Sequence, residues 1–268
     1  MAVQIFTTVV NRPDFVEIQK KLFDKFLLDE YQFHVIDDSI DRDLELEFKY
    51  ICQNNSIFYY KKPPKKSEMN PAQACAEAVQ WTFDEIIKKK YNQDIVLFCD
   101  SDMFLVEEFS IKDYMEGEVI AGHYQTRDHV YYMWNGIMFF DMKKIMEVDS
   151  DLDFSDGYVE NILTDVGGNL YYYFERNKDK FKMKYVNDNF NYHPEYPLEY
   201  NGIDLCDKNL IWSGELKENI QFELHLDGKF LHYRAASNWF SRTWRSSNDP
   251  LLNKTEIFNK IIGEILND

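Results

Sequence analysis

Ile95-Val96-Leu97-Phe98-Cys99-Asp100-Ser101-Asp102 is the segment with the clearest structural signal in the chain. Its first five residues are apolar without interruption, which is the pattern of a β-strand covered on both faces in a mostly parallel sheet. The apolar run stops at two aspartates separated by one serine. Because ligands of open α/β sheets collect beyond the carboxyl ends of the strands, we expect these aspartates to lie at a binding site.

A helix is expected directly before this strand. Asn70 suits the N-cap, Pro71 suits the first helical position, and Gln73 stands where a capping box has Glu or Gln. Three lysines at 88–90 suit the last turn, because positive charge complements the negative end of the helix dipole. The apolar face of this helix is formed at helical spacing by Cys75, Val79, Phe83 and Ile86.

The N-terminal residues alternate between strand and helix signals. A β-branched run at 3–10 stops at Asn11-Arg12-Pro13, and apolar residues at helical spacing follow it. The next strand is expected at 31–36 and leads into Asp37-Asp38-Ser39. The basic stretch 61–66, which contains two prolines, is expected to be an exposed loop. This alternation predicts an α/β fold with a mixed, mostly parallel central sheet and helices on both faces.

The second half of the chain has a weaker pattern. Strands are expected at 119–123 and 138–140, on either side of a polar aromatic loop at 125–135. A C-terminal helix is expected at about 254–266. No internal repeat or low-complexity linker divides the sequence, so we expect a single domain over residues 1–268.

The composition excludes several classes of protein. The chain has 30 Lys and Arg against 47 Asp and Glu, a net charge of −17, which argues against a nucleic-acid partner. A hydrophobic content of 45% is that of a folded protein. The four cysteines form no CxxC pair, and no apolar run approaches the ~20 residues of a membrane span. We therefore expect a soluble, cytoplasmic protein without a membrane span.

Asp100 and Asp102 have the chemistry of a site for a divalent cation. Two carboxylates separated by one residue can converge where a chain leaves a strand, and hard oxygen ligands suit Mg²⁺ or Mn²⁺, which keep positions open for phosphate oxygens. The alternative is that the two carboxylates only solvate a loop. The apolar residues before and after them, the latter at 103–106, favour the cation site.

These motifs resemble those of the metal-dependent nucleotide-sugar glycosyltransferases of the GT-A fold. The hydrophobic strand ending in Asp-x-Asp at 95–102 is similar to the metal motif of that family. The segment 134–140, Trp-Asn-Gly followed by apolar residues, resembles its Trp-Asn-Gly strand, and 164–168 resembles its acidic sugar-contacting segment. His232 resembles its late metal-binding histidine. The glycogenin-like pattern is not followed after His232, so a retaining or an inverting outcome stays open.

The resemblance implies a hexose transfer from a nucleotide sugar, expected to be a UDP-sugar, to a glycan hydroxyl, with Mn²⁺ or Mg²⁺ on the diphosphate. Residues 1–103 would form the nucleotide-sugar half and 104–250 the acceptor half. The implied metal ligands are Asp100, Asp102 and His232, and the implied catalytic base of an inverting enzyme is Asp165. The implied donor contacts are Thr7, Thr8, Val9, Asp37, Asp100, Ser101, Trp134, Asn135 and Gly136.

Alternatives stay open for single residues and for the function. His232 can be a buried strand histidine, Asp165 an ordinary N-cap, and Trp134 a core residue. A haloacid-dehalogenase-like phosphatase also has Asp-x-Asp after a strand, but that motif wants Thr where this chain has Phe104. A non-catalytic sugar-binding protein is the third possibility, and the β-α alternation opposes the β-sandwich that such modules usually have.

Overall fold

The structure, a computed structural model, describes residues 1–64, 71–186, 199–200, 203–204, 222–233 and 250–267. The chain forms two compact units. The first unit contains 1–16, 28–101 and 110–187, and the second contains 17–27, 102–109 and 188–268. No helix in the described ranges is long and apolar enough to cross a bilayer.

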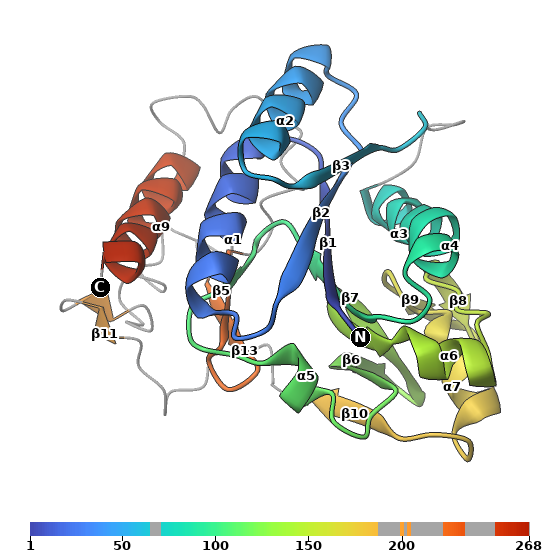
Figure 1. Ribbon diagram of the computed structural model, residues 1–268. Helices are drawn as coiled ribbons and strands as arrows, with labels where there is room; N and C mark the ends of the chain where they lie inside the picture. Colours follow the sequence, from blue (N-terminus) through green and yellow to red (C-terminus); the bar gives the residue numbers. More distant parts are fainter. Residues whose placement is uncertain (65–70, 187–198, 201–202, 205–221, 234–249, 268) are drawn as a thin grey trace. The chain divides into compact units, whose positions relative to one another are not determined.

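A seven-stranded sheet forms the centre of the first unit (Figure 1). β7 is antiparallel to both of its neighbours, and every other adjacent pair is parallel, so the expected mixed and mostly parallel sheet is confirmed. In order across the sheet the strands are β10 (Met183–Val186), β6 (Ile120–Arg127), β7 (Val130–Asp141), β4 (Ile95–Asp100), β1 (Val3–Val9), β2 (Tyr31–Asp37) and β3 (Phe58–Lys61).

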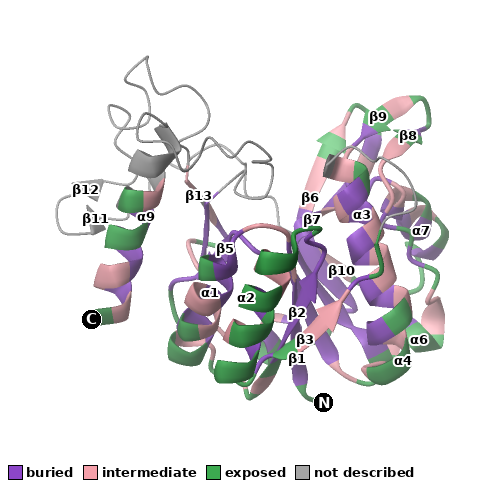
Figure 2. Cartoon of the chain, turned by 90° about the horizontal axis from the view of Figure 1, so that it is seen from above, coloured by how far each residue is buried: buried purple, intermediate pink, exposed green. Residues whose placement is uncertain are grey.

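Helices cover both faces of this sheet, as expected. α2 lies on one face, and α3, α4 and α6 lie on the other (Figures 1 and 2). A two-stranded hairpin of β8 (Gly157–Val159) and β9 (Ile162–Thr164) precedes α7. The helices of the unit are α2 (Arg42–Asn54), α3 (Pro71–Thr82), the π-helical turn η1 (Phe83–Ile87), α4 (Lys88–Lys90), α5 (Ile111–Tyr114), α6 (Met142–Val148) and α7 (Leu170–Asn177).

The helix expected before β4 is present as the continuous series α3, η1 and α4, which begins at Pro71 and ends at Lys90. The proposed N-cap, Asn70, lies outside the described residues. The expected apolar face is largely buried, because Val79, Phe83 and Ile86 belong to a hydrophobic core cluster and the partly buried Cys75 packs against it. The same core contains Phe98 of β4, so this helix covers the strand that ends at Asp100.

The prediction of a loop at 125–135 is wrong. These residues form the turn and the adjoining strand residues of a long hairpin, in which β6 and β7 pair up to Arg127 and Val130. The turn has only two residues, and Asp128 takes a φ of 56°, a left-handed conformation that Asp tolerates in tight hairpin turns. Polar residues in this stretch indicated a loop, but Tyr132 is fully buried and the aromatic residues favour strand.

The second unit contains a three-stranded sheet of β13 (Glu223–His225), β14 (Phe230–His232) and β5 (Met103–Leu105). α9 (Pro250–Asn267) spans the helix expected at 254–266, and its Phe258 ring lies 4.7 Å from the ring of Phe104 in β5. α1 (Pro13–Phe26) has its first turn in the first unit and its remainder in the second. A two-residue pair, β11 (Glu199–Tyr200) with β12 (Ile203–Asp204), completes the described strands.

His34 of β2 is a fully buried imidazole in the first unit. It stacks on Phe6 with ring centroids 4.4 Å apart. Gln4 donates through Nε2 to Asp94, so its Oε1 accepts from His34 Nε2 at 2.7 Å. Burial, and then the positive charge of Lys90, lower the pKa of His34 from 6.5 to about 3. The histidine is therefore neutral in the folded protein.

This buried imidazole predicts a loss of stability in mild acid. Below pH 6.5 the unfolded chain protonates His34, while the folded chain does not until about pH 3, so the folded state loses stability as the pH falls. Urea unfolding of wild type and His34→Phe between pH 6 and 4 should show a wild-type loss larger by about 1.4 kcal/mol per pH unit. The exposed His129→Phe should keep the wild-type slope. Equal slopes for His34→Phe and wild type would contradict the neutral assignment.

Candidate active site

The carboxyl edge of the central sheet brings together several of the expected site residues. Asp100 is the last residue of β4 and is partly exposed. Asn135 of β7 is 2% exposed, and its Nδ2 lies 3.4 Å from Asp100 Oδ1 and 3.1 Å from the Sγ of Cys75 on α3. One amide thus connects the strand that ends at Asp100 to the helix that covers it.

Negative charge from several carboxylates acts on the thiol of Cys75. Burial raises the pKa of the Cys75 thiol well above its ordinary value, and the negative charge of Asp100 raises it further. The hydrogen bond from Asn135 acts in the opposite direction, while the charges of Asp165 and Asp38 again raise the pKa. Carboxylates from three separate segments thus each favour the neutral form of this thiol. Sequence analysis assigned Cys75 only to the apolar face of the helix.

Asp37, expected to contact the donor, is fully buried at the end of β2. Its Oδ1 accepts from the Ser39 backbone at 2.8 Å. Its Oδ2 accepts from the Tyr59 hydroxyl at 2.6 Å and lies 3.1 Å from Lys61 Nζ. Both oxygens are thus used inside the protein. Asp37 fixes the turn after β2.

The neighbouring Lys62 corrects the expected exposed loop at 61–66. Lys61 is the last residue of β3, and Lys62 is only 4% exposed. The Lys62 ammonium lies 3.3 Å from Asp38 Oδ1 and 2.7 Å from Glu77 Oε2 on α3. A buried ammonium requires such partners. These ion pairs could not be predicted from the sequence, because both acidic partners are distant in the chain.

The three expected contacts in β1 do not share a face of the sheet. Thr8 stands beside Asp100 in the parallel register, so both side chains lie on the same face. Thr7 and Val9 alternate to the opposite face and are fully buried. Of the three, Thr8 is the residue that shares a face with the carboxylate.

The segment from Trp134 to Gly136 is also divided by strand alternation. Asn135 faces Asp100, whereas the ring of Trp134 lies edge-on to His123 with centroids 6.2 Å apart. The Trp134 indole also covers Gly136, because a Cβ at that position would lie 2.0 Å from the ring. Gly136 is therefore required for this position of the indole.

Asp165 lies in a turn between β9 and α7. Its backbone N–H donates to the Tyr132 hydroxyl at 3.2 Å, and its Oδ1 accepts from the Val166 backbone at 2.8 Å. Its side chain is 43% exposed, and Oδ2 lies 3.8 Å from an Arg127 nitrogen. The N-cap of α7 is Asn169, so Asp165 does not cap this helix. The carboxylate is thus available to a ligand.

Gly167 and Gly168 hold this turn against β7 and β9. Gly167 has a φ of +86°, and a Cβ there would lie 2.3 Å from the backbone oxygen of Met133. A Cβ on Gly168 would lie 1.9 Å from Thr164 Oγ1. Both glycines belong to the segment 164–168 that resembles a sugar-contacting motif, and the structure requires them for close packing of the turn.

Gly167→Ala and Gly117→Ala form a matched test of this packing. Gly117 has a similar φ of +80° but open space around it. Each substitution should lose roughly 1–2 kcal/mol from the left-handed conformation. Gly167→Ala should lose about 1–3 kcal/mol more, because its Cβ meets a backbone oxygen. Urea denaturation measures both variants, and equal losses would show that the turn is not tightly packed.

The second unit contains the other two expected metal ligands. His232 Nε2 lies 3.6 Å from Asp102 Oδ1, and both side chains are almost completely buried. The pairing of β14 with β5 places His232 opposite Met103. The Tyr233 backbone N–H donates to the backbone oxygen of Asp102 at 2.8 Å. The ring of His225 lies 5.4 Å from that of His232.

Asp102 and His232 fit a shared cation. Two ligands about 2.1 Å from one ion lie roughly 3.0 to 3.4 Å apart, which is close to the observed 3.6 Å. Among the described residues, no group of three or more His, Cys, Asp or Glu side chains is arranged to hold a metal. Ser101, directly before Asp102, is 5% exposed.

Several solved structures to which this chain is similar are glycosyltransferases. No protein-family model and no curated protein matches the chain. The mannosyltransferase PcManGT from Pyrobaculum calidifontis, in complex with GDP-Man and Mn²⁺, has a TM-score of 0.46 and 8% identity over 69% of this chain and 55% of that chain. The galactosyltransferase LgtC, in complex with donor and acceptor sugar analogs, has a TM-score of 0.49 and 14% identity over 97% and 95%. Both TM-scores are below 0.5.

Proposed function

We propose that this chain is a glycosyltransferase that moves a hexose from a nucleoside diphosphate sugar, specifically a UDP-sugar, to a hydroxyl of a glycan. The position of Asp100 at the end of β4, two residues before Asp102, which lies 3.6 Å from His232, carries this proposal. Such carboxylates repel a diphosphate unless a divalent cation binds with it. A free hydroxyl acceptor, in contrast, is neutral and is not repelled.

The cation is Mn²⁺ or Mg²⁺. Asp102 and His232 would hold it, since their oxygen and nitrogen have the spacing of two ligands. Asp100 keeps the role that the Asp-x-Asp motif predicts, a contact through water or through the ribose. When bound, the ion offsets the negative charge that develops on the departing diphosphate. A cation with few protein ligands keeps positions open for phosphate oxygens.

We propose that Asp165 contacts the reacting hydroxyl. In an inverting reaction, the acceptor oxygen bonds to the anomeric carbon while the bond from that carbon to the diphosphate breaks. The bonding electrons leave with the nucleoside diphosphate, and the hydroxyl proton passes to Asp165. The 43% exposed carboxylate supports this role, because a general base must reach its substrate. In a retaining reaction the same carboxylate would bind sugar hydroxyls.

The remaining expected residues take supporting roles in this proposal. Asn135 orients Asp100 through the contact of 3.4 Å, and Thr8 shares the face of the sheet on which a donor would bind. Asp37 supports the turn at Asp38 and Ser39 rather than touching the donor, since its oxygens are already hydrogen-bonded. The phosphatase alternative gains no support, because Phe104 is a buried residue of β5.

Thermal unfolding tests the metal-dependent donor site. Mn²⁺ and UDP together should raise the melting temperature by more than the sum of the separate shifts, because ligands that bind the folded state stabilise it by about 2.7 kcal/mol at 100 times Kd. Asp102→Asn should abolish the joint shift, and the exposed control Asp179→Asn should keep it. A joint shift that survives in Asp102→Asn would remove Asp102 from the metal site. A wild type that responds to no nucleotide with Mn²⁺ would refute the proposed function.

A further inference from the structure

The side chain of Gln80 on α3 is bonded to a distant segment of the first unit. Its Oε1 accepts from the Phe154 backbone at 2.9 Å. Its Nε2 donates to the Leu152 oxygen at 3.1 Å and to Asp84 Oδ2 at 2.8 Å. Gln80 thus uses both ends of its amide, and two of its three bonds hold the backbone of the same short segment.

That segment holds the turn that carries Asp165. The Gly167 backbone donates to the Phe154 oxygen at 2.8 Å, and the Asn169 backbone donates to the Ser155 oxygen at 3.2 Å. Phe154 therefore receives a bond from the turn on its oxygen and donates a bond to Gln80 from its nitrogen. The path from α3 to the turn is a series of direct hydrogen bonds.

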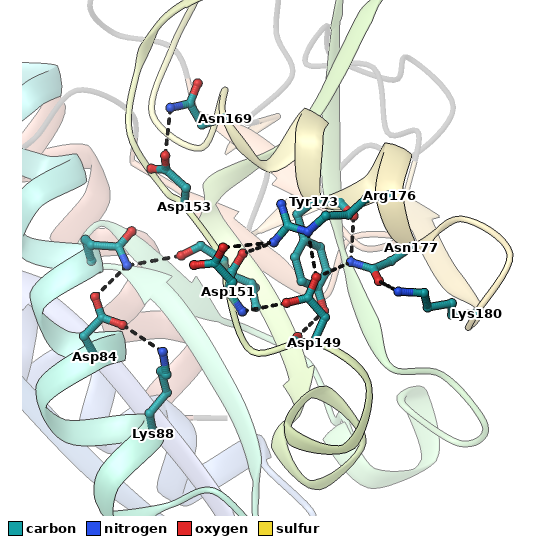
Figure 3. Close-up of polar contacts among 12 residues, drawn as sticks. Asp84, Lys88, Asp149, Asp151, Asp153, Asn169, Tyr173, Arg176, Asn177 and Lys180 are labelled. Carbon is teal, nitrogen blue, oxygen red and sulfur yellow. Dashed lines mark hydrogen bonds and ion pairs between the residues drawn. The ribbon is translucent and has the colours of Figure 1, made fainter.

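Side chains fix the same segment at further points (Figure 3). Asn169 donates to Asp153 at 2.9 Å, and both Arg176 and Asn177 of α7 donate to Asp149 at 2.7 Å. Burial raises the pKa of Asp149, but these hydrogen bonds outweigh it and the pKa lies below its ordinary value. The segment is thus firmly attached to α7, and Gln80 attaches it to α3.

The same helix also reaches the other part of the candidate site. Cys75 lies five positions before Gln80 on α3 and accepts the amide of Asn135, which in turn lies beside Asp100. Asp100, Asn135 and Cys75 form one group, which we call the Asp100 cluster. The helix α3 therefore belongs to this cluster through Cys75 and is connected to the Asp165 turn through Gln80 and Phe154. The distance between Cys75 and Gln80 along the helix axis is set by the rise of about 1.5 Å per residue in an α-helix.

We propose that Gln80 is a positioning residue that sets the place of Asp165 relative to the Asp100 cluster. This inference rests on the proposed function, in which Asp100 belongs to the donor site and Asp165 contacts the reacting hydroxyl. A displacement of a catalytic group by about 1 Å can reduce turnover by about a hundredfold. Gln80 touches no reacting atom and acts through Phe154 and Gly167.

Gln80→Met tests this role, because methionine has a similar length and makes none of the three hydrogen bonds. With the accepted UDP-sugar and acceptor, the kcat should fall at least about tenfold, in the same direction as in Asp165→Asn. The KM for the donor and the joint thermal shift with Mn²⁺ and UDP should stay within about twofold and about 1 °C of wild type, since the donor contacts are intact. The exposed Gln73→Met on the same helix serves as the control.

Gln80→Glu provides a rescue. Its neutral carboxylic acid can accept from the Phe154 backbone and donate to the Leu152 oxygen, whereas its carboxylate can only accept. The kcat of Gln80→Glu relative to wild type should therefore rise as the pH falls. An unchanged kcat in Gln80→Met, or a kcat and donor KM that deteriorate together, would overturn the positioning role.

Amide hydrogen exchange tests the inference without turnover. In Gln80→Met the Gly167 amide should exchange at least about tenfold faster, because its acceptor Phe154 is no longer held, while amides of β4 keep their rates. An unchanged Gly167 rate would refute the inference even in an active enzyme. Faster exchange at Gly167 in Gln80→Met, found together with a wild type that transfers no sugar, would leave the positioning contact intact and refute the proposed function.

Discussion

Repulsion between carboxylates is the constraint on which the candidate site depends. Asp38, Asp100 and Asp165 follow three different segments of the chain, yet all three act on the thiol of Cys75. Such a grouping opposes folding unless the charges are offset by partners or by a bound cation. Lys62 offsets Asp38, an Arg127 nitrogen lies 3.8 Å from Asp165, and Asn135 donates to Asp100. The remaining negative charge is what makes a cation with a diphosphate a suitable ligand.

Strands, a tight turn and a helix hold these carboxylates in place despite their like charges. Parallel strands end at one edge of the sheet, which brings Asp100 and the turn at Asp38 together. The Asp165 turn is held by Gly167, whose left-handed conformation allows contact with Met133. The helix α3 is attached to this group, because its Cys75 accepts a hydrogen bond from the side chain of Asn135. Local strain and like charges are tolerated because the surrounding hydrogen bonds leave these side chains few other positions.

Short-range patterns predicted much of this arrangement. The apolar run before Asp100 predicted a buried strand, and β4 is one, because a strand covered on both faces has no need of alternation. Lys62 was not predictable as a buried residue, since two prolines beside it indicate a loop and its partners Asp38 and Glu77 are remote in sequence. The hairpin around Asp128 was predicted as a loop, because the polar residues on both sides of its two-residue turn are typical of loops.

Long-range contacts account for the other differences. The roles of Cys75 and Gln80 arise only when α3 packs on the sheet, and neither side chain stands in a motif that predicts it. The spacing of Asp102 and His232 depends on the pairing of β5 with β14, which joins residues more than a hundred positions apart. Gly167 belongs to a segment that resembles a sugar-contacting motif, but only the folded backbone reveals that it serves packing.

We infer that this carboxylate group accepts a diphosphate only together with a divalent cation. Isothermal titration of wild-type protein with UDP, first with saturating Mn²⁺ and then with EDTA, measures this dependence. Mn²⁺ should tighten UDP binding by at least about a hundredfold, which corresponds to about 2.7 kcal/mol. Equal Kd values for UDP in the two titrations would contradict it.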